Sequence, residues 1–281
     1  ALQASVVPDC SFAGCSDCGV CGPDLGNNVV VPPPAVPAAK PQLAPPSARV
    51  SRIRFRFSKT GPMALLSHLD LVRLLERALR RSGLPVSFTG GFHPLPRLQL
   101  ALALPLGVEG EGEWMDLEFL EAVDAAEVMD RWQRTLPPGL QLLSAREVAV
   151  SSRSLSQQLE SSRWRFMLRC AEGTSRSAPA WEPAIEALLS QDALIWEDTD
   201  KKGRPRRRDV RHLLESLQRL EPPNSSSLVN PCSAELELVA TVDPQGRSLK
   251  PSQVQLWISQ QLGLELSLSR VRRMELTLLQ C

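Results

Sequence analysis

Hydrophobic residues alternate with arginines near residue 50, and this pattern predicts the first strand. Ile53, Phe55 and Phe57 occupy every second position, so the strand is expected to have one apolar and one basic face. A helix is predicted next, because leucines recur at helical spacing after the N-cap residue Ser67 and the pattern stops at Gly83.

The remaining pattern repeats one order of elements twice. In the first half, extended segments at 84–88, 98–104, 113–120 and 140–150 follow that helix, with a second helix at 122–136. In the second half, strands are predicted at 164–170, 193–197, 234–242 and 268–279, with helices at 183–189 and 251–262. Each half reads as βαββαβ. The sequence therefore predicts an α+β fold of two tandem ferredoxin-like halves with antiparallel sheets.

Composition shifts suggest the boundaries. Residues 26–49 are rich in proline and alanine and form a predicted linker behind a disordered, cysteine-bearing tail at 1–25. The serine-rich stretch 151–162 begins the second half, so the halves are expected at 50–150 and 151–281. The second half contains an insertion at 201–231, with a basic loop and one expected helix.

Length and composition narrow the class of protein. The 281 residues are 43% hydrophobic and 22% charged, enough for about two domains. There is neither a secretory signal nor an apolar run of the ~18 residues that would span a bilayer, so no membrane association is expected. The seven cysteines are odd in number and clustered, which favours a reducing, cytoplasmic location over a disulfide framework.

Four of these cysteines form one compact group. Cys10, Cys15, Cys18 and Cys21 have the spacing C-x4-C-x2-C-x2-C, which lets a single loop supply four thiolates. An iron–sulfur cluster or a structural zinc ion is the functional interpretation. The alternative is a reduced tail that binds no metal.

Basic residues form three clusters although the formal net charge is only +1. Each could neutralise phosphates of a nucleic acid, and the alternative is a set of solvated surfaces. The predicted nucleic-acid-binding residues are Arg52, Arg54 and Arg56 on the first strand, Arg73 and Arg77 on the first helix, Arg97, and Lys201, Lys202, Arg204, Arg206, Arg207 and Arg208 in the insertion.

Two histidines are candidates for acid–base chemistry. His68 lies at the start of the first helix, and His93 lies in a loop rich in glycine and proline. Together they could cleave RNA by general acid–base catalysis without a metal. The alternative is that His68 caps or packs beside its helix and His93 packs in its loop. Residues 107–112 lack a phosphate-binding glycine pattern and are interpreted as a turn.

Four sequence runs resemble the bacterial radical-SAM-linked protein family. They are Phe55-Arg56-Phe57-Ser58-Lys59-Thr60-Gly61, Leu66-Ser67-His68-Leu69-Asp70-Leu71, Gly91-Phe92-His93-Pro94-Leu95-Pro96-Arg97 and Leu104-Pro105-Leu106-Gly107-Val108. That family is found beside, or fused behind, B12-binding-type radical-SAM proteins. The resemblance covers roughly residues 50 to 280 and implies a role tied to such an enzyme, without supplying a reaction.

The same resemblance bears on cofactors and partners. The cysteine-bearing tail looks like the end of the radical-SAM region itself, so the chain is expected to be part of a longer fusion. The CxxxCxxC motif that binds S-adenosylmethionine is absent, so this cofactor is expected only through a partner or a missing region. Neighbouring ribonuclease and ribosomal-protein genes in that family favour RNA as a further partner.

The leading hypothesis is an accessory module without catalytic activity of its own, which recognises RNA or an RNA-bound partner for a radical-SAM enzyme. One alternative is a metal-independent endoribonuclease, because tandem ferredoxin-like halves with a Gly-rich loop and a histidine are similar to the CRISPR repeat-processing enzymes. The other is a scaffold that docks onto protein and binds no nucleic acid.

Overall fold

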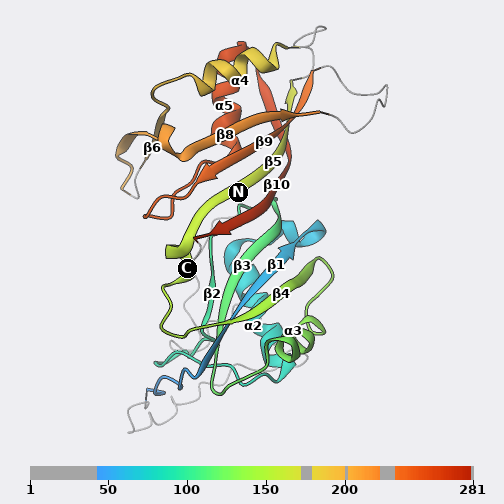
Figure 1. Cartoon of the computed structure of the whole chain (residues 1–281), viewed down its shortest axis with the longest axis vertical. Coiled ribbons are helices and arrows are strands. Elements are labelled where there is room, and N and C mark those ends of the chain that lie inside the picture. Colours follow the sequence, from blue (N-terminus) through green and yellow to red (C-terminus); the bar gives the residue numbers. More distant parts are fainter. Residues whose placement is uncertain (1–42, 172–178, 200–201, 222–231, 280–281) are drawn as a thin grey trace, which may run out of the picture. The chain divides into compact units, whose positions relative to one another are not determined.

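A mixed sheet of eight strands organises the chain from Ala44 onward (Figure 1). The computed structural model describes residues 43–171, 179–199, 202–221 and 232–279. The strands of the sheet are β1 (Ser51–Lys59), β2 (Leu98–Leu100), β3 (Glu109–Phe119), β4 (Leu140–Val148), β5 (Leu159–Cys170), β8 (Leu214–Leu220), β9 (Ser233–Thr241) and β10 (Leu266–Leu278).

Helices and one separate hairpin complete the described part of the chain. The helices are α2 (His68–Ser82), α3 (Ala125–Gln133), α4 (Trp181–Leu189) and α5 (Pro251–Leu262), with short 3-10 turns η1 (Gly61–Leu65), η2 (Leu155–Gln158) and η3 (Arg211–Leu213). The hairpin pairs β6 (Ile195–Thr199) with β7 (Pro205–Asp209). These elements confirm the predicted α+β class.

The strand order is β4-β1-β3-β10-β5-β9-β8, and β2 pairs with β3 beside that path. All neighbours are antiparallel except β3 and β10, which pair in parallel through Arg272 with Glu109 and Arg273 with Gly110. A Cβ on Gly112 would lie 2.8 Å from the Met274 carbonyl oxygen, so only glycine permits this approach of the two backbones. The sheet is therefore continuous and mixed, where two antiparallel sheets were predicted.

Helix α2 follows the local signals in its sequence. The Ser67 side chain accepts a hydrogen bond from the Asp70 backbone N–H, and Gly83 ends the helix with a φ of 63°. Its apolar face buries Leu75 and three neighbours against the core of β1 and β3. In the same core Phe55 meets Trp132 of α3 edge to face, with the ring centroids 5.2 Å apart.

The second core lies under α4 and α5, which pack on each other (Figure 1). Trp164, Phe166 and Leu168 alternate along β5 and are all buried, so one face of this strand is the floor of that core. Helix α5 has Pro251 in its first turn and Gly263 at its end with a φ of 62°.

Two local predictions were wrong, because in each case the segment is a strand whose pairing partner lies outside the segment itself. Residues 107–112 were interpreted as a turn, yet β3 begins at Glu109 and extends there to reach β10. The insertion was expected to contain a helix after its basic loop. Instead Leu214 and Leu217 are buried, and this segment pairs with β9 as β8.

The end of the predicted linker lies against the first half. The Ser47 N–H bonds to the Phe88 carbonyl, and Ala44 forms a bridge with Gly91. Cys10, Cys15, Cys18 and Cys21, with the rest of residues 1–42, lie outside the described residues. Within the described part of the chain, no helix is long and apolar enough to cross a membrane.

Candidate functional site

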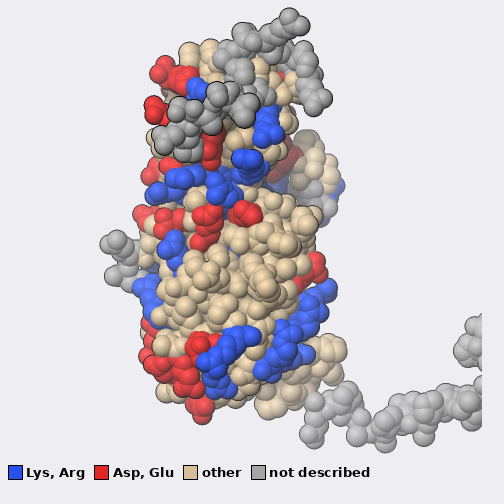
Figure 2. Space-filling model, turned by 90° about the vertical axis from the view of Figure 1, so that its right-hand side faces the viewer, with Lys and Arg blue, Asp and Glu red and all other residues tan. Residues whose placement is uncertain are grey.

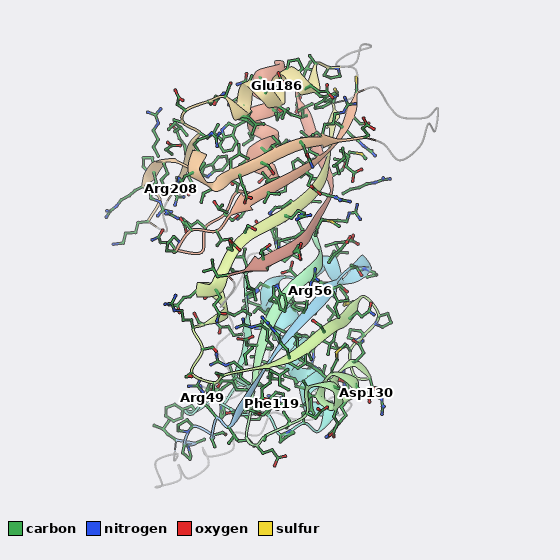
Figure 3. All side chains as sticks on the ribbon, viewed as in Figure 1. Arg49, Arg56, Phe119, Asp130, Glu186 and Arg208 are labelled. Atoms are coloured by element: carbon green, nitrogen blue, oxygen red, sulfur yellow. The ribbon has the colours of Figure 1, made fainter. Side chains whose placement is uncertain are left out.

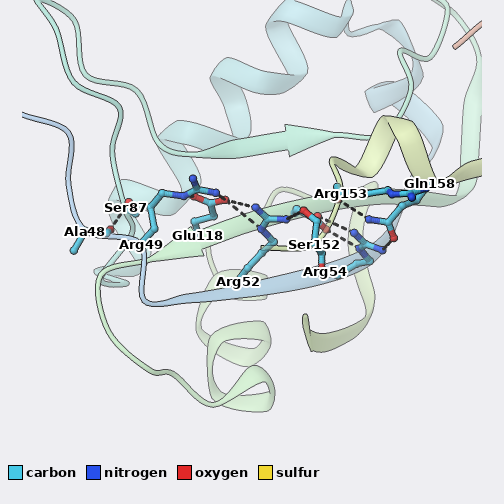
Figure 4. Close-up of polar contacts among 10 residues, drawn as sticks. Ala48, Arg49, Arg52, Arg54, Ser87, Glu118, Ser152, Arg153 and Gln158 are labelled. Carbon is cyan, nitrogen blue, oxygen red and sulfur yellow. Dashed lines mark hydrogen bonds and ion pairs between the residues drawn. The ribbon is translucent and has the colours of Figure 1, made fainter. Parts of the chain in front are cut away.

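The arginines of β1 form an internal layer of ion pairs (Figure 4). The Arg54 guanidinium donates to both carboxylate oxygens of Asp116, at 2.8 and 2.9 Å, and also to Gln158. Arg52 pairs with Glu118 at 2.7 Å. Their side chains are only 2% and 8% exposed, so this face of β1 is not the open basic surface that its alternation suggested.

Glu118 holds two arginines at once. Arg49 bonds to its carboxylate at 2.5 and 2.7 Å from the opposite side to Arg52 (Figure 4). Burial alone would raise the pKa of Glu118, but the hydrogen bonds from Arg49 and Arg52 outweigh it and the pKa is lowered. Glu118 is therefore an anion shared by both arginines, and its one negative charge offsets one of their two positive charges.

The other predicted cations of the first half do not share one site. Arg56 is 35% exposed and lies 3.4 Å from Glu275, whereas Arg73 and Arg77 lie on the exposed face of α2. Arg97 is half-buried, and its Nε has no hydrogen-bond partner among the described residues. On the face drawn in Figure 2, basic side chains form separate groups with acidic side chains beside them.

The two candidate histidines lie in different surroundings. His68, at the first position of α2, lines a small cavity of about 10 Å³ that has room for about one water molecule. His93 is exposed in its loop and is not among the residues that line this cavity.

Three buried charged residues were missed by the sequence analysis, and they meet beside that cavity. Glu113 accepts two hydrogen bonds from Arg273, at 2.8 and 2.5 Å, and Lys59 donates to the Leu66 carbonyl at 2.9 Å. Lys59 and Arg273 are 1% exposed and Glu113 is 4% exposed. The sequence contained a signal for Lys59, because it occupies the next alternate position after Ile53, Phe55 and Phe57 and so falls on the face of β1 that was expected to be apolar.

Lys59 should make stability depend on pH. Burial lowers its pKa from the ordinary 10.5, Glu113 opposes this and Arg273 adds to it. The folded state holds this proton less tightly than the unfolded state does. The free-energy cost of burying charged Lys59 is therefore fully present below its pKa in the folded state. It is relieved as the pH rises toward 10.5.

We therefore expect the free energy of unfolding of the native chain, relative to Lys59→Met, to rise between about pH 7 and about pH 10. Urea unfolding at the two pH values measures this difference. A difference that stays constant, or falls, would contradict the assignment.

A cavity with a volume of about 460 Å³ lies in the second half, where it meets the loop that follows β2. Its apolar wall contains Trp164, Trp196, Val210, Leu213 and Leu249, with Leu102 and Pro105 from the first half. Trp196 is held from outside the pocket by Trp257, edge to face at 6.1 Å. Arg273 lines the same pocket, so it links this site to Glu113.

Three cations from separate segments also line this pocket. Arg208 comes from β7, Arg247 from the turn after β9, and Lys250 from the N-cap of α5. Asp198 pairs with Arg208, and Asp243 pairs with Arg247 at 2.6 Å, so two acids orient the guanidiniums. Lys250 is exposed and forms no ion pair with any described residue.

Two aspartates that line this pocket accept hydrogen bonds from backbone N–H groups. Burial would raise the pKa of Asp243, but the Arg247 backbone N–H and guanidinium lower it overall. The pKa of Asp209 is lowered because the backbone N–H groups of Arg211 and Leu194 donate to its carboxylate. Asp243 therefore stabilises the turn that presents Arg247, and Asp209 ties the end of β7 to Leu194 just before β6.

The predicted basic loop is largely a hairpin. Arg206, Arg207 and Arg208 lie on β7 opposite Asp198, Glu197 and Trp196 of β6. Lys202 and Arg204 are exposed near the turn, and Lys201 lies outside the described residues. Arg208 and Arg56 lie well apart in Figure 3, so the hairpin and β1 do not form one basic surface. The acids at 197 and 198 were the signal that this cluster is partly neutralised.

The comparisons identify the family. A family model described as an uncharacterized protein conserved in bacteria (DUF2344) matches residues 52–251, so the chain belongs to this family. No curated protein matches the chain.

Solved structures give only a distant likeness. The crystal structure of a Cbf5-Nop10-Gar1 complex has a chain 12% identical, with a TM-score of 0.43, covering 81% of this chain and 49% of that one. An unknown protein from Galdieria sulphuraria is 13% identical, with a TM-score of 0.22 and coverages of 81% and 99%. The chain thus spans about half the length of the Cbf5-complex chain. These TM-scores are too low to carry a functional argument.

Proposed function

We propose that this chain is a recognition module that binds RNA, or an RNA-bound partner, for a radical-SAM enzyme. The observation that carries the proposal is the convergence of Arg208, Arg247 and Lys250, from three separate segments, on one partly aromatic pocket. Cations that neutralise phosphates supply most non-specific affinity for nucleic acids, and aromatic faces accept unpaired bases.

The strand order supports a further interpretation, that of two ferredoxin-like halves. Within the first half the order is β4-β1-β3-β2, and within the second it is β10-β5-β9-β8. In each case the first and last strands of a βαββαβ unit are neighbours. We propose that the recognition pocket belongs mainly to the second of these halves.

The link to a radical-SAM enzyme rests on the sequence runs that contain Lys59, His68 and His93. The metal at Cys10, Cys15, Cys18 and Cys21 remains a prediction of the same kind. Metal analysis of the anaerobically purified chain would test it: iron with sulfide, or zinc, would support it, and the absence of both would contradict it.

RNA binding is tested by neutralising three cations that line the pocket. In Arg208→Gln/Arg247→Gln/Lys250→Gln we expect weaker binding of a single-stranded RNA, and the slope of log K against log salt should be smaller by about 2 to 3. Gln is preferred to Glu because Arg208 pairs with Asp198 and Arg247 pairs with Asp243. Fluorescence anisotropy from about 50 to 200 mM salt gives both quantities.

The matched control removes the same charge from α2, as Arg73→Gln/Arg77→Gln/Arg80→Gln. It should leave affinity and slope nearly unchanged, because these exposed residues do not line the pocket. Equal losses in both variants would overturn the proposed site. RNA cleavage without metal that is lost in His68→Ala would favour the endoribonuclease, and co-purification with a radical-SAM core without RNA would favour the scaffold.

A further inference from the structure

We infer that the pocket at Trp196 receives one nucleoside monophosphate unit, with its base against Trp196 and its phosphate beside Arg247 and Lys250. The shared chemistry is an aromatic base that carries a phosphate, either free or within an RNA strand. This inference rests on the proposed function, because it names the part of the RNA that the same site would take.

The aromatic wall is suited to a base. Trp196 lines the pocket and is half-buried, and its contact with Trp257 limits how far its ring can turn. Trp164, which is 2% exposed, lines the pocket as well. A rigid aromatic side chain stacks on an unpaired base of any kind, since every base has a π-face.

The polar side of the pocket is suited to a phosphate. Arg247 remains 47% exposed while Asp243 holds it, and Lys250 adjoins it at the start of the 12-residue helix α5. The first turn of α5 contains Ser252, which also lines the pocket, and the partial positive charge of a helix N-terminus favours an anion. Base and phosphate sites are thus present in one cavity.

One polar atom of Arg208 is not accounted for by its ion pair with Asp198. Its Nε is buried and has no hydrogen-bond partner among the described residues, although its side chain lines the pocket. Buried donors are normally satisfied, so this N–H lacks an acceptor, and an oxygen of a bound ligand would reach it once the Arg208 side chain shifts toward the pocket. The volume of about 460 Å³ lies in the lower part of the range for small-molecule sites, which suits one nucleotide better than several.

The test compares two substitutions at one position. Binding of a single-stranded RNA hexamer and of free AMP and UMP is measured by calorimetry for the native chain, Trp196→Leu and Trp196→Phe. We expect Trp196→Leu to weaken binding roughly tenfold to hundredfold, and Trp196→Phe to retain most of the affinity because it keeps an aromatic face. Thermal unfolding verifies that both variants are folded.

A second variant probes the phosphate without disturbing the core. Lys250→Gln removes an exposed charge that pairs with no acid in the described ranges. It should lower the salt slope by about 1 and weaken binding of the mononucleotides as well. A nucleoside without a phosphate should be insensitive to this change.

The outcomes separate the two proposals. If RNA binds but both Trp196→Leu and Lys250→Gln leave its affinity unchanged, the nucleotide pocket is overturned while RNA recognition stands. If the mononucleotides bind with the expected dependence on Trp196 but RNA does not, RNA recognition is overturned and the pocket stands. If neither binds, both fail.

Discussion

Glu113→Ala is expected to lower the free energy of unfolding by about 3–5 kcal/mol. Glu113 is the carboxylate paired with Arg273, and Lys59 lies close enough for its charge to matter. Without Glu113 the Arg273 guanidinium keeps its bonds to the Leu102 and Ala103 carbonyls but has no counter-charge at 1% exposure. The midpoint of urea unfolding near pH 7 measures the loss.

Two further variants separate charge from packing. Glu113→Gln retains the shape and an acceptor oxygen, so it should cost less than Glu113→Ala. Adding Lys59→Met to Glu113→Ala should recover part of the loss, because it removes one of the two buried cations. If the double variant is as unstable as the sum of the single ones, the three side chains are not coupled electrostatically.

The second large effect is expected at the pair of Arg54 with Asp116. Asp116→Ala should destabilise the chain by about 3–5 kcal/mol, because it leaves the buried Arg54 guanidinium with Gln158 as its one side-chain partner in the part of the chain that the structure describes. Replacing both partners, as Arg54→Met/Asp116→Leu, should restore most of the stability, since an apolar pair of similar volume needs no desolvation of charge. Denaturant unfolding measures both.

A matched control uses an exposed pair. Asp130 of α3 and the C-cap residue Arg134 have side chains 58% and 73% exposed, so Asp130→Ala should change stability by less than about 1 kcal/mol. Similar losses at Asp116 and Asp130 would mean that burial does not determine the strength of these pairs.

Helices and strands marked by both a hydrophobic pattern and end signals could be predicted from the sequence. Whether their polar faces are buried or exposed could not. Strand β1 and helix α2 lie where alternation, the Ser67 cap and Gly83 placed them. The alternating arginines on β1 are nevertheless equally compatible with a solvent-exposed face and with a buried one. The decision depends on Asp116 and Glu118, which pair with Arg54 and Arg52 from a strand more than 60 residues away.

The candidate pocket could not be predicted from local sequence patterns, for a related reason. Its cations come from β7, the turn after β9 and the start of α5, while its aromatic wall combines β5 with β6. The basic cluster near residue 206 could be recognised from composition. That Arg208 would line one pocket with Arg247 and Trp164 follows only from how the β6–β7 hairpin packs beside the main sheet, which no single segment encodes.

Strand β10 has a consequence for how the chain acquires its structure during synthesis. It lies between β3 and β5, yet it follows both in sequence, separated from β5 by more than 90 residues. Until the ribosome releases it, both of those strands have an unpaired edge and Glu113 lacks Arg273. Unpaired edges invite association with other chains. A nascent chain stalled before residue 266 should therefore need a chaperone or remain prone to aggregate.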